Sequence, residues 1–483
     1  MSNANHVQAD RLMARMGPTG IVSPASSARR GMWVSKLARS WIHALLRRIT
    51  SDQLIIRDAP ADGSSGTSAT YGSSSGDLVG LIIVRDLRAY RAIVTEGAAG
   101  LGRGYIEGWW DSPDPVTAVR VIIRNMAAID AFRNRLHRRI GWATDRVRNL
   151  LPRRGRSGNR EDIAAHYDLG NAFFELFLDE TMTYSCGVFP STSSTLAEAS
   201  LHKYDLLLGK LGVTSSHRLL EIGTGWGGLA LRAAETTGCQ LTTTTISVEQ
   251  FSEAKCRVGA AGYEDQVELL DVDWRDLSGS FDRIVSIEMI EAVGWRDYDA
   301  FFATIERCLK PDGLVAIQAI CLPDSRYERA KNTEDFIRRF VFPNGCLPSI
   351  GAISRSVGRA TDMEIIGVED YSSHYAETLR RWRMCFDERL DDVRALGLDD
   401  RFCRLWRFYL AYCEAGFRER HCTVNQFVLA GHAWRGAPEM AGASAEVGEA
   451  PTHRSVPHDS NRSVSCAARV DLTGHDARAV PGR

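Results

Sequence analysis

The stretch from Arg218 to Ala230 constrains the fold of this chain more than any other. It reads Arg-Leu-Leu-Glu-Ile-Gly-Thr-Gly-Trp-Gly-Gly-Leu-Ala, which predicts a buried strand, a glycine-rich turn and the start of a helix. Gly223, Gly225 and Gly227 lack a Cβ atom, so the backbone there can turn sharply and approach a ligand closely. A strand, a glycine turn and a helix in this order predict a nucleotide-binding site.

The residues around this turn indicate the class of ligand. Glu221 ends the predicted strand, and a carboxylate there suits a cationic or amine-bearing ligand such as S-adenosylmethionine. A dinucleotide site would instead place a pyrophosphate on the helix N-terminus. Four threonines, 242–245, occupy the end of the next predicted strand, with no acid where a dinucleotide site binds a ribose. The pattern favours S-adenosylmethionine and leaves another nucleotide, or a turn without a ligand, as alternatives.

From 161 to 435 predicted strands alternate with helices, which is typical of a doubly wound α/β fold with a Rossmann-like sheet. We expect strands at 218–222, 240–246, 267–272, 283–287 and 314–320, and helices from 228, at 248–259 and at 298–310, with a turn at Pro311-Asp-Gly. Ligands of such sheets bind at the carboxyl ends of the strands. There Trp274 is placed to stack on an adenine, and Glu288 and Glu291 follow an apolar strand.

Composition divides the rest of the chain. We expect a small α+β domain at 29–130, with a strand at 78–84 and a flexible Gly/Ser-rich loop at 58–76. A basic connector at 131–160 joins it to the domain at 161–435. We expect the tails, 1–28 and 436–483, to be disordered.

Net charge is only −1 over 483 residues, but the positive charge is concentrated. Ten arginines lie between Arg133 and Arg160 against one acid, Asp145, and a second basic run at 29–48 mixes arginines with apolar residues at helical spacing. Both segments suit an anionic bilayer surface. The alternatives are a solvated linker and an amphipathic helix docked on its own domain. No motif that reads nucleic acid accompanies the charge, so we expect no nucleic-acid partner.

Other classes of protein are disfavoured. No apolar run reaches about 18 residues and the N-terminus is polar, so neither a membrane-spanning helix nor a signal peptide is predicted. The 11 cysteines are scattered, with no CxxC pair and no metal-ligand spacing. We therefore expect no metal, and a cytoplasmic protein that reaches lipids from the surface.

Several segments between 164 and 427 carry a family resemblance. They are Ala165–Phe174, Thr183–Phe189, the glycine turn, Asp282–Glu291, Phe342–Ser349, His374–Trp382 and Val424–Phe427. In this order they resemble the cyclopropane-fatty-acyl-phospholipid synthase family, which includes the mycolic acid cyclopropane synthases. Gly104–Asp111 also resembles the acyl-phospholipid synthases that carry an extra first domain. The resemblance implies a class I methyltransferase sheet preceded by a small lipid-associated α+β domain.

The resemblance also implies an activity: S-adenosylmethionine-dependent methyl transfer to the cis double bond of an unsaturated acyl chain in a membrane phospholipid, giving a cyclopropane. The partner would be the bilayer, reached from its cytoplasmic face, and a homodimer is left open. A methylene- or methyl-branched chain on the same substrates is the first alternative. A methyltransferase for a soluble small molecule and a non-catalytic lipid-binding protein are weaker ones.

The family's site residues carry over onto positions of this sequence. The cofactor residues would be Tyr184, Ser185, Glu221, Gly223, Gly225, Gly227, Thr245, Ile246, Gln250, Trp274 and Arg275. In the family a bound bicarbonate removes the proton from the methylated intermediate. Its holders here would be Cys186, the backbone of Ile287, Glu291, Tyr375 and the position of Gln318. Cys186 taken alone is more typical of a buried core residue.

Three positions depart from the family pattern. Gln318 replaces a histidine and cannot become a cation, so it would hold bicarbonate less firmly. Glu288 replaces a small residue, and two carboxylates near one anion would repel it unless one is protonated. Arg275 stands where relatives have an acidic or polar residue. We expect Glu291, beside Tyr375 and Cys186, to orient the base; Glu288 is the alternative if the product is branched.

Overall fold

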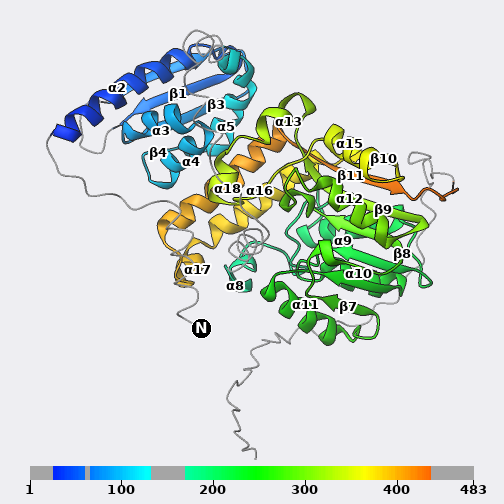
Figure 1. Ribbon diagram of the computed structural model, residues 1–483. Helices are drawn as coiled ribbons and strands as arrows, with labels where there is room; N and C mark the ends of the chain where they lie inside the picture. The colour runs from blue at the N-terminus through cyan, green and yellow to red at the C-terminus, as the bar shows by residue number, and fades with distance from the viewer. Residues whose placement is uncertain (1–25, 60–65, 132–168, 437–483) are drawn as a thin grey trace, which may run out of the picture. The chain divides into compact units, whose positions relative to one another are not determined.

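A seven-stranded sheet forms the core of the larger part of the molecule (Figure 1). The computed structural model describes residues 26–59, 66–131 and 169–436, with side chains of the first helix from residue 34 onward. The strand order is β10-β11-β9-β8-β5-β6-β7. The strands are β5 (Arg218–Ile222), β6 (Gln240–Thr244), β7 (Val267–Leu270), β8 (Phe281–Ile287), β9 (Leu309–Cys321), β10 (Glu364–Asp370) and β11 (Thr423–Ala430). Strands β5 to β9 pair in parallel, whereas β11 is antiparallel to both β9 and β10.

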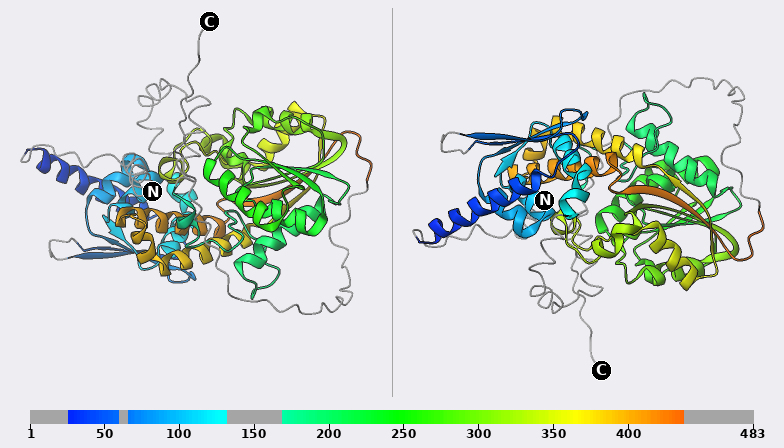
Figure 2. Two further views of the ribbon diagram at one scale, coloured as in Figure 1. Left: turned by 90° about the horizontal axis from the view of Figure 1, so that it is seen from below. Right: turned by 90° about the horizontal axis from the view of Figure 1, so that it is seen from above.

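Helices cover both faces of this sheet, which confirms the doubly wound α/β prediction (Figure 2). On one face Leu207 and Ala233 pack with Leu219 and Leu241 of the strands. On the other, Phe302 and Ile353 pack with strand residues that include Ile317. The covering helices are α9 (Leu196–Lys210), α10 (Gly228–Thr237) and α11 (Val248–Ala261) on the first face, and α12 (Tyr298–Cys308) and α15 (Ile350–Ala360) on the second.

The predicted turn at Pro311-Asp-Gly is wrong. Helix α12 already ends at Cys308, and the three residues lie within β9, where the pairing with β8 shifts register. The backbone is extended there because the carbonyls of Pro311 and Gly313 accept hydrogen bonds from the amides of Ala433 (2.8 Å) and Gly431 (2.9 Å). Proline lacks an N–H, but its carbonyl still pairs with the chain that follows β11.

The N-terminal part is a smaller sheet with helices, in strand order β2-β1-β3-β4. Its elements are α2 (Ser26–Leu46), β1 (Gln53–Asp58), β2 (Thr67–Gly72), β3 (Val79–Val84), α3 (Arg88–Glu96), α4 (Ala98–Ile106), β4 (Trp110–Asp111) and α5 (Pro115–Arg124). The strand predicted at 78–84 is present as β3. The loop predicted at 58–76 contains strand β2, which pairs with β1 along its whole length and buries Tyr71. Its threonines and tyrosine favour an extended edge strand.

Helix α2 docks on its own sheet, as one of the two interpretations of the basic run 29–48 proposed. Ile42, Leu45 and Leu46 are buried, whereas Val34 and Leu37 are exposed. The arginine-rich run from Arg133 to Arg160 and both predicted tails, except their innermost residues, lie outside the described residues. Among the described helices, none is long and apolar enough to cross a membrane.

Two long helices, α16 (Ser372–Glu388) and α18 (Asp400–Arg418), run side by side and connect the small sheet to the site (Figures 1 and 2). The ring of Phe408 on α18 stacks on Tyr105 and meets Trp110 edge-on. Just after α18, the carboxylate of Glu419 accepts hydrogen bonds from Arg120 (2.6 Å) and Arg124 (2.8 Å) of α5. The same hydrophobic core therefore extends from the N-terminal sheet to the helices that carry Tyr375 and Tyr409.

Candidate active site

The glycine turn between β5 and α10 has the backbone that its sequence predicts. Gly223, Gly225 and Gly227 all have positive φ angles (102°, 53° and 84°), which side chains with a Cβ rarely adopt. A Cβ at Gly223 would meet Met289 at 3.2 Å, and one at Gly227 would meet Ala254 at 3.2 Å. A Cβ at Gly225 would meet nothing within 4 Å. The turn is therefore closely packed at Gly223 and Gly227, whereas open space lies next to Gly225.

Polar side chains at the ends of β5 and β6 are fixed around this turn. The buried carboxylate of Glu221 accepts a hydrogen bond from Thr243 Oγ1 (2.7 Å). Burial raises the pKa of Glu221 to about 8, although that hydrogen bond and the charge of Lys203 oppose the shift. Thr245 Oγ1 donates to Gln250 Oε1 (3.0 Å), which fixes the start of α11 beside the turn. These groups present oxygen acceptors to a ligand that carries hydroxyl or amino groups.

Aromatic side chains border the same space. The ring of Trp274 packs edge-on against Phe301, and the guanidinium of Arg275 lies 4.4 Å from the centre of the Trp274 ring. Arg275 is held there by ion pairs with Asp273 (3.1 Å) and Asp297 (3.3 Å). An aromatic face in the wall of the same cavity as the glycine turn is suited to stack on a flat heterocycle.

One cavity of about 1260 Å³ brings the predicted site residues together. All seventeen predicted positions line it except Gly227, Cys186 and Gln318. Gly227 is covered by α11, and the other two stand behind Glu288. The cavity exceeds the roughly 300–1,000 Å³ typical of small-molecule sites, so it has room for more than a cofactor.

Glu288 is the centre of the hydrogen-bond network beside the turn. Its Oε1 accepts from the backbone amide of Cys186 (2.8 Å) and from Gln318 Nε2 (2.8 Å), and its Oε2 accepts from the hydroxyl of Tyr375 (2.6 Å). Its backbone is left-handed, with φ 50°, in a residue that is not glycine. Gln318 is itself oriented by Gln426, whose Nε2 donates to Gln318 Oε1 (2.9 Å). Burial raises the pKa of Glu288, and its three donors oppose that shift.

Glu291 occupies a different environment. Its Oε1 accepts from the backbone amide of Ile320 (2.6 Å), and its Oε2 has no hydrogen-bond partner within the described part of the chain. Burial, followed by the charge of Glu288, raises the pKa of Glu291 to about 8. At neutral pH Glu291 is therefore mostly protonated. Glu288 accepts from three donors where Glu291 accepts from one, and these donors favour the ionised form of Glu288.

The predicted position of Glu291 is wrong in this respect: Glu288 makes the contacts with Tyr375 and Cys186 that we expected of Glu291. The left-handed backbone at Glu288 turns its side chain toward these groups. The thiol of Cys186 points elsewhere and donates to the carbonyl of Gly187 (3.2 Å), and burial raises its pKa. Cys186 thus contributes its backbone amide to the network and its side chain to the core.

The family model described as mycolic acid cyclopropane synthetase matches residues 155–427, more than half of the chain. The chain belongs to this family. The sequence resemblance is thereby confirmed, and with it a fold and cofactor class shared with S-adenosylmethionine-dependent methyltransferases.

Curated relatives from this family match a longer part of the chain than the family model does. A tuberculostearic acid methyltransferase of Mycobacterium tuberculosis is 41% identical over 80% of this chain and 90% of its own length. A cyclopropane-fatty-acyl-phospholipid synthase of Escherichia coli is 32% identical over 75% of this chain and 89% of its own. These two names describe different reactions, so membership of the family does not decide the product.

Solved structures of cyclopropane synthases cover more than half of this chain. A cyclopropane synthase from Mycobacterium tuberculosis has a TM-score of 0.53 at 31% identity, covering 58% of this chain and 99% of that one. A mycolic acid cyclopropane synthase complexed with SAH and CTAB has a TM-score of 0.52 at 32% identity, covering 56% and 98%. The second structure contains SAH.

Sequence reasoning missed a buried lysine of this cyclopropane synthetase fold. Lys203 on α9 is fully buried; its Nζ donates to Ser185 Oγ (2.6 Å) and lies 4.5 Å from the centre of the Tyr204 ring. Burial lowers the pKa of Lys203 to about 8, while the nearby charge of Glu288 opposes the shift. The spacing of the sequence could have indicated its burial. Lys203 lies four residues after Ala199 and four before Leu207, on the buried face of α9.

Proposed function

We propose that this protein transfers a methyl group from S-adenosylmethionine to the double bond of an unsaturated acyl chain in a membrane phospholipid, with the carboxylate of Glu288 as the base. The observation that carries the proposal is the hydrogen-bond network of Glu288 within the family's cavity. The bilayer surface is the proposed partner, supported by the name of the phospholipid synthase relative. The cytoplasmic face of the membrane is the proposed location. A homodimer stays a prediction.

The cavity fits the cofactor that the family implies. Gly225 leaves open space above the turn, and Glu221 and Gln250 offer acceptors around it. Trp274 provides the aromatic face, and Tyr184 and Ser185 would approach from the other wall. When bound, S-adenosylmethionine supplies an electrophilic methyl group on a sulfonium. The role of the protein is to hold the alkene near that methyl in a site without bulk water, because water would quench a carbocation.

Bicarbonate fits this site less well than the family pattern implies. The groups that would hold it are the amide of Cys186, the hydroxyl of Tyr375 and the side chain at 318, and all three donate to Glu288. A carboxylate and a bicarbonate offer similar oxygen acceptors, so the side chain of Glu288 stands in for the anion. Three donors stabilise its ionised form, while one lone-pair direction is left to take a proton. Bicarbonate has no part in the proposed reaction.

The fate of the methylated intermediate decides the product. The new carbon–carbon bond uses the π electrons of the alkene and leaves a cation on the neighbouring carbon. Loss of a methyl proton to Glu288, with closure of the third bond, gives a cyclopropane. A hydride shift from the methylated carbon to the cation, followed by loss of a methyl proton, gives a methylene branch. Both routes need a base at the same methyl group, so the position of Glu288 serves either.

We propose the methylene-branched chain as the main product. The relative with 41% identity is named a methyltransferase, and it covers 80% of this chain. The cyclopropane is the second candidate, supported by the synthase with 32% identity. Mass spectrometry of phospholipid acyl chains from cells that express the protein gives the product mass; ozonolysis then separates a methylene branch, which is cleaved, from a ring, which is not.

Glu288→Gln tests the proposed base. It keeps the shape of the side chain but cannot accept a proton, so we expect turnover to fall by about 10²–10⁴-fold while affinity for S-adenosylmethionine stays within about twofold. Glu291→Gln is the matched comparison, because it changes a carboxyl group of the same cavity that is already protonated, and should keep most of the activity. Full activity in Glu288→Gln, or a larger loss in Glu291→Gln, would return the role to Glu291.

A further inference from the structure

The cavity continues well beyond the glycine turn and Glu288. One end is the proposed methyl-transfer site, and the other is lined by apolar side chains of the N-terminal sheet's helices: Trp41, Ile42 and Leu45 of α2, Ile93 of α3 and Ile122 of α5. Between the two ends the wall is formed by α13 (Asp324–Ala330), α14 (Phe336–Phe340) and the end of α18. The space thus has an end that carries the polar groups of the proposed methyl-transfer site, a middle with charged side chains, and an apolar far end.

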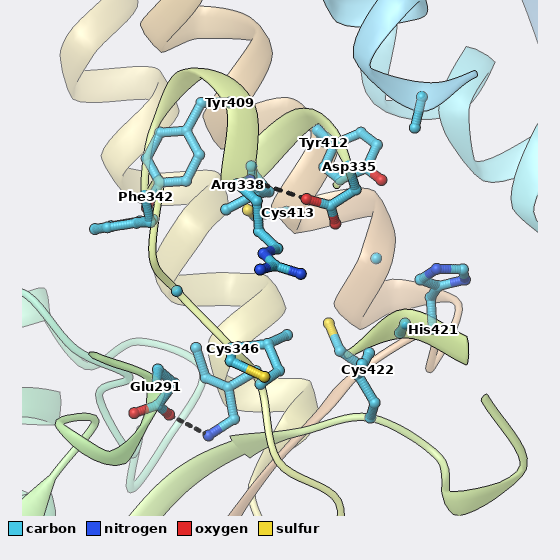
Figure 3. A pocket seen from close by; sticks show the side chains of 18 of the residues that line it. Glu291, Asp335, Arg338, Phe342, Cys346, Tyr409, Tyr412, Cys413, His421 and Cys422 are labelled. Carbon is cyan, nitrogen blue, oxygen red and sulfur yellow. Dashed lines mark hydrogen bonds between the residues drawn. The ribbon is translucent and has the colours of Figure 1, made fainter. Parts of the chain in front are cut away.

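Two arginines in this middle have no carboxylate partner among the described residues. Arg338 donates through Nη1 to the backbone carbonyls of Thr333 (2.9 Å) and Lys331 (3.3 Å), and its buried Nε has no partner within that same set. Figure 3 shows its guanidinium pointing into the space bounded by Cys346, Cys413 and Cys422.

Arg326, on α13, lines the same part of the cavity and its Nη2 contacts the ring of His421. Burial, followed by the charge of Arg326, lowers the pKa of His421 to about 4, so this histidine is neutral near pH 7.

The other charged groups near the two arginines are largely balanced. Arg329 pairs with Asp130, and Glu419 is bound by Arg120 and Arg124. Asp335 accepts from the backbone amide of Arg338 (2.9 Å), and burial raises the pKa of this carboxyl group. Lys331 pairs with the exposed Glu328. Against the two arginines stand the buried carboxyl group of Asp335, near Arg338, and the exposed Glu334. Two guanidinium groups without a paired carboxylate in the part of the chain that the structure describes, close to the apolar far end, suit an anion that carries long apolar chains.

We propose that this cavity binds a whole diacyl phospholipid, with Arg326 and Arg338 at the phosphodiester, the reacting chain extended toward Glu288, and the second chain among the apolar side chains of α2, α3 and α5. The assignment of the reacting chain rests on the proposed function. The two arginines support the phosphodiester site. The apolar side chains at the far end of the cavity support the placement of the second chain there.

Binding, rather than turnover, tests this arrangement. The probes are a short-chain phosphatidylglycerol below its critical micelle concentration, a diacylglycerol of the same chain length, the matching one-chain lysophosphatidylglycerol, and inorganic phosphate. Each is titrated calorimetrically into the full-length protein. We expect the phospholipid to bind at least about tenfold more tightly than the diacylglycerol, because hydrogen bonds to charged groups are stronger than those to neutral ones.

Arg338→Gln and Arg326→Gln should each remove most of that preference and leave diacylglycerol affinity unchanged. Arg389→Gln, at an exposed arginine paired with Asp392, is the control. Arg338 also holds the chain at 331–333, so Arg326→Gln provides an independent variant if Arg338→Gln folds poorly. An unchanged preference in both variants would overturn the phosphodiester site, and so would inorganic phosphate binding as tightly as the lipid.

Ile93→Trp tests the second chain, because it fills the far end of the cavity. Affinity for the two-chain lipid should fall about tenfold, to that of the one-chain lipid, whose own affinity should not change. Val79→Trp, at an exposed position of the same sheet, is the control. Equal losses for both lipids would overturn the placement of the second chain. Because these measurements need no methyl transfer, they can show whether the lipid binds even if the proposed reaction is wrong.

Discussion

At the scale of single residues, one backbone angle decides which of two glutamates reaches the hydrogen-bond network of Tyr375, Cys186 and Gln318. Glu288 has a φ of 50°, which costs a residue with a Cβ of the order of 1 kcal/mol or more. Three hydrogen bonds to its carboxylate hold it in that conformation. The sequence places two carboxylates just after strand β8, but the spacing does not show which one points toward Tyr375. That depends on contacts with Cys186 and Gln318, which lie 102 and 30 residues away along the chain.

The pKa of Glu291 predicts a pH dependence of stability. The folded-state pKa of about 8 lies above the ordinary 4.5, so the folded protein keeps a proton that the unfolded chain releases between these values. This group's contribution to stability is full below about pH 4.5 and is lost as pH rises toward 8. The loss is about 1.4 kcal/mol per pH unit.

Between pH 5.5 and 7.5 the free energy of unfolding of Glu291→Gln should therefore fall by roughly 2.5 kcal/mol less than that of the wild type. Urea unfolding of the cofactor-free protein at both pH values measures it. Glu377→Gln is the control, since ion pairs with Arg380 and Arg381 lower the pKa of Glu377 to about 2, below this window. Parallel declines in wild type and Glu291→Gln would show that Glu291 is already ionised in the folded protein at pH 5.5.

At the scale of elements, the sequence predicts those strands and helices whose local pattern agrees with their packing. Strand β5 and helix α10 begin where the motif places them, because the glycine turn and the apolar strand are both local features. Pro311-Asp-Gly has the composition of a turn, yet it is extended because distant backbone amides after β11 bind its carbonyls. Strand β2 was missed for a similar reason, since its Gly/Ser-rich surroundings conceal six residues that pair with β1.

The turn between β5 and α10 gives an element-level prediction. Gly225→Val would place a branched side chain in the open space above the turn, so affinity for S-adenosylmethionine should fall at least about 100-fold. Gly262→Val is a matched control: Gly262 also has a positive φ, 75°, and open space around it, but does not line the cavity. Both variants should lose about 1–2 kcal/mol of stability from backbone strain. Calorimetry should show normal binding in Gly262→Val alone, and equal binding in both variants would exclude the turn from the cofactor site.

At the scale of the molecule, contacts nearly 300 residues apart join the N-terminal sheet to the helices of the site. Arg120 and Glu419 are 299 positions apart, and Arg404 donates to the carbonyl of Tyr105 (2.6 Å) across a similar separation. Sequence reasoning predicted a small N-terminal domain but not that it shares a core with α16 and α18. No local pattern carries that information, because the faces that meet are each ordinary apolar faces of amphipathic elements.

This shared core predicts that the backbone amides of the two sheets lose their protection from hydrogen exchange together. Phe408 is fully buried and touches Tyr105, Trp110 and Phe336, so Phe408→Ala should destabilise the protein by about 3–5 kcal/mol. Hydrogen exchange read by mass spectrometry reports β3 and β8 separately. If the core unfolds as one unit, exchange in both strands should accelerate by a similar factor, because each opens only through global unfolding. Val368→Ala, at an exposed position of edge strand β10, should leave both unchanged. Faster exchange in β3 with full protection in β8 would mean that the N-terminal sheet opens independently, and the second acyl chain would then bind to a part of the molecule with its own stability.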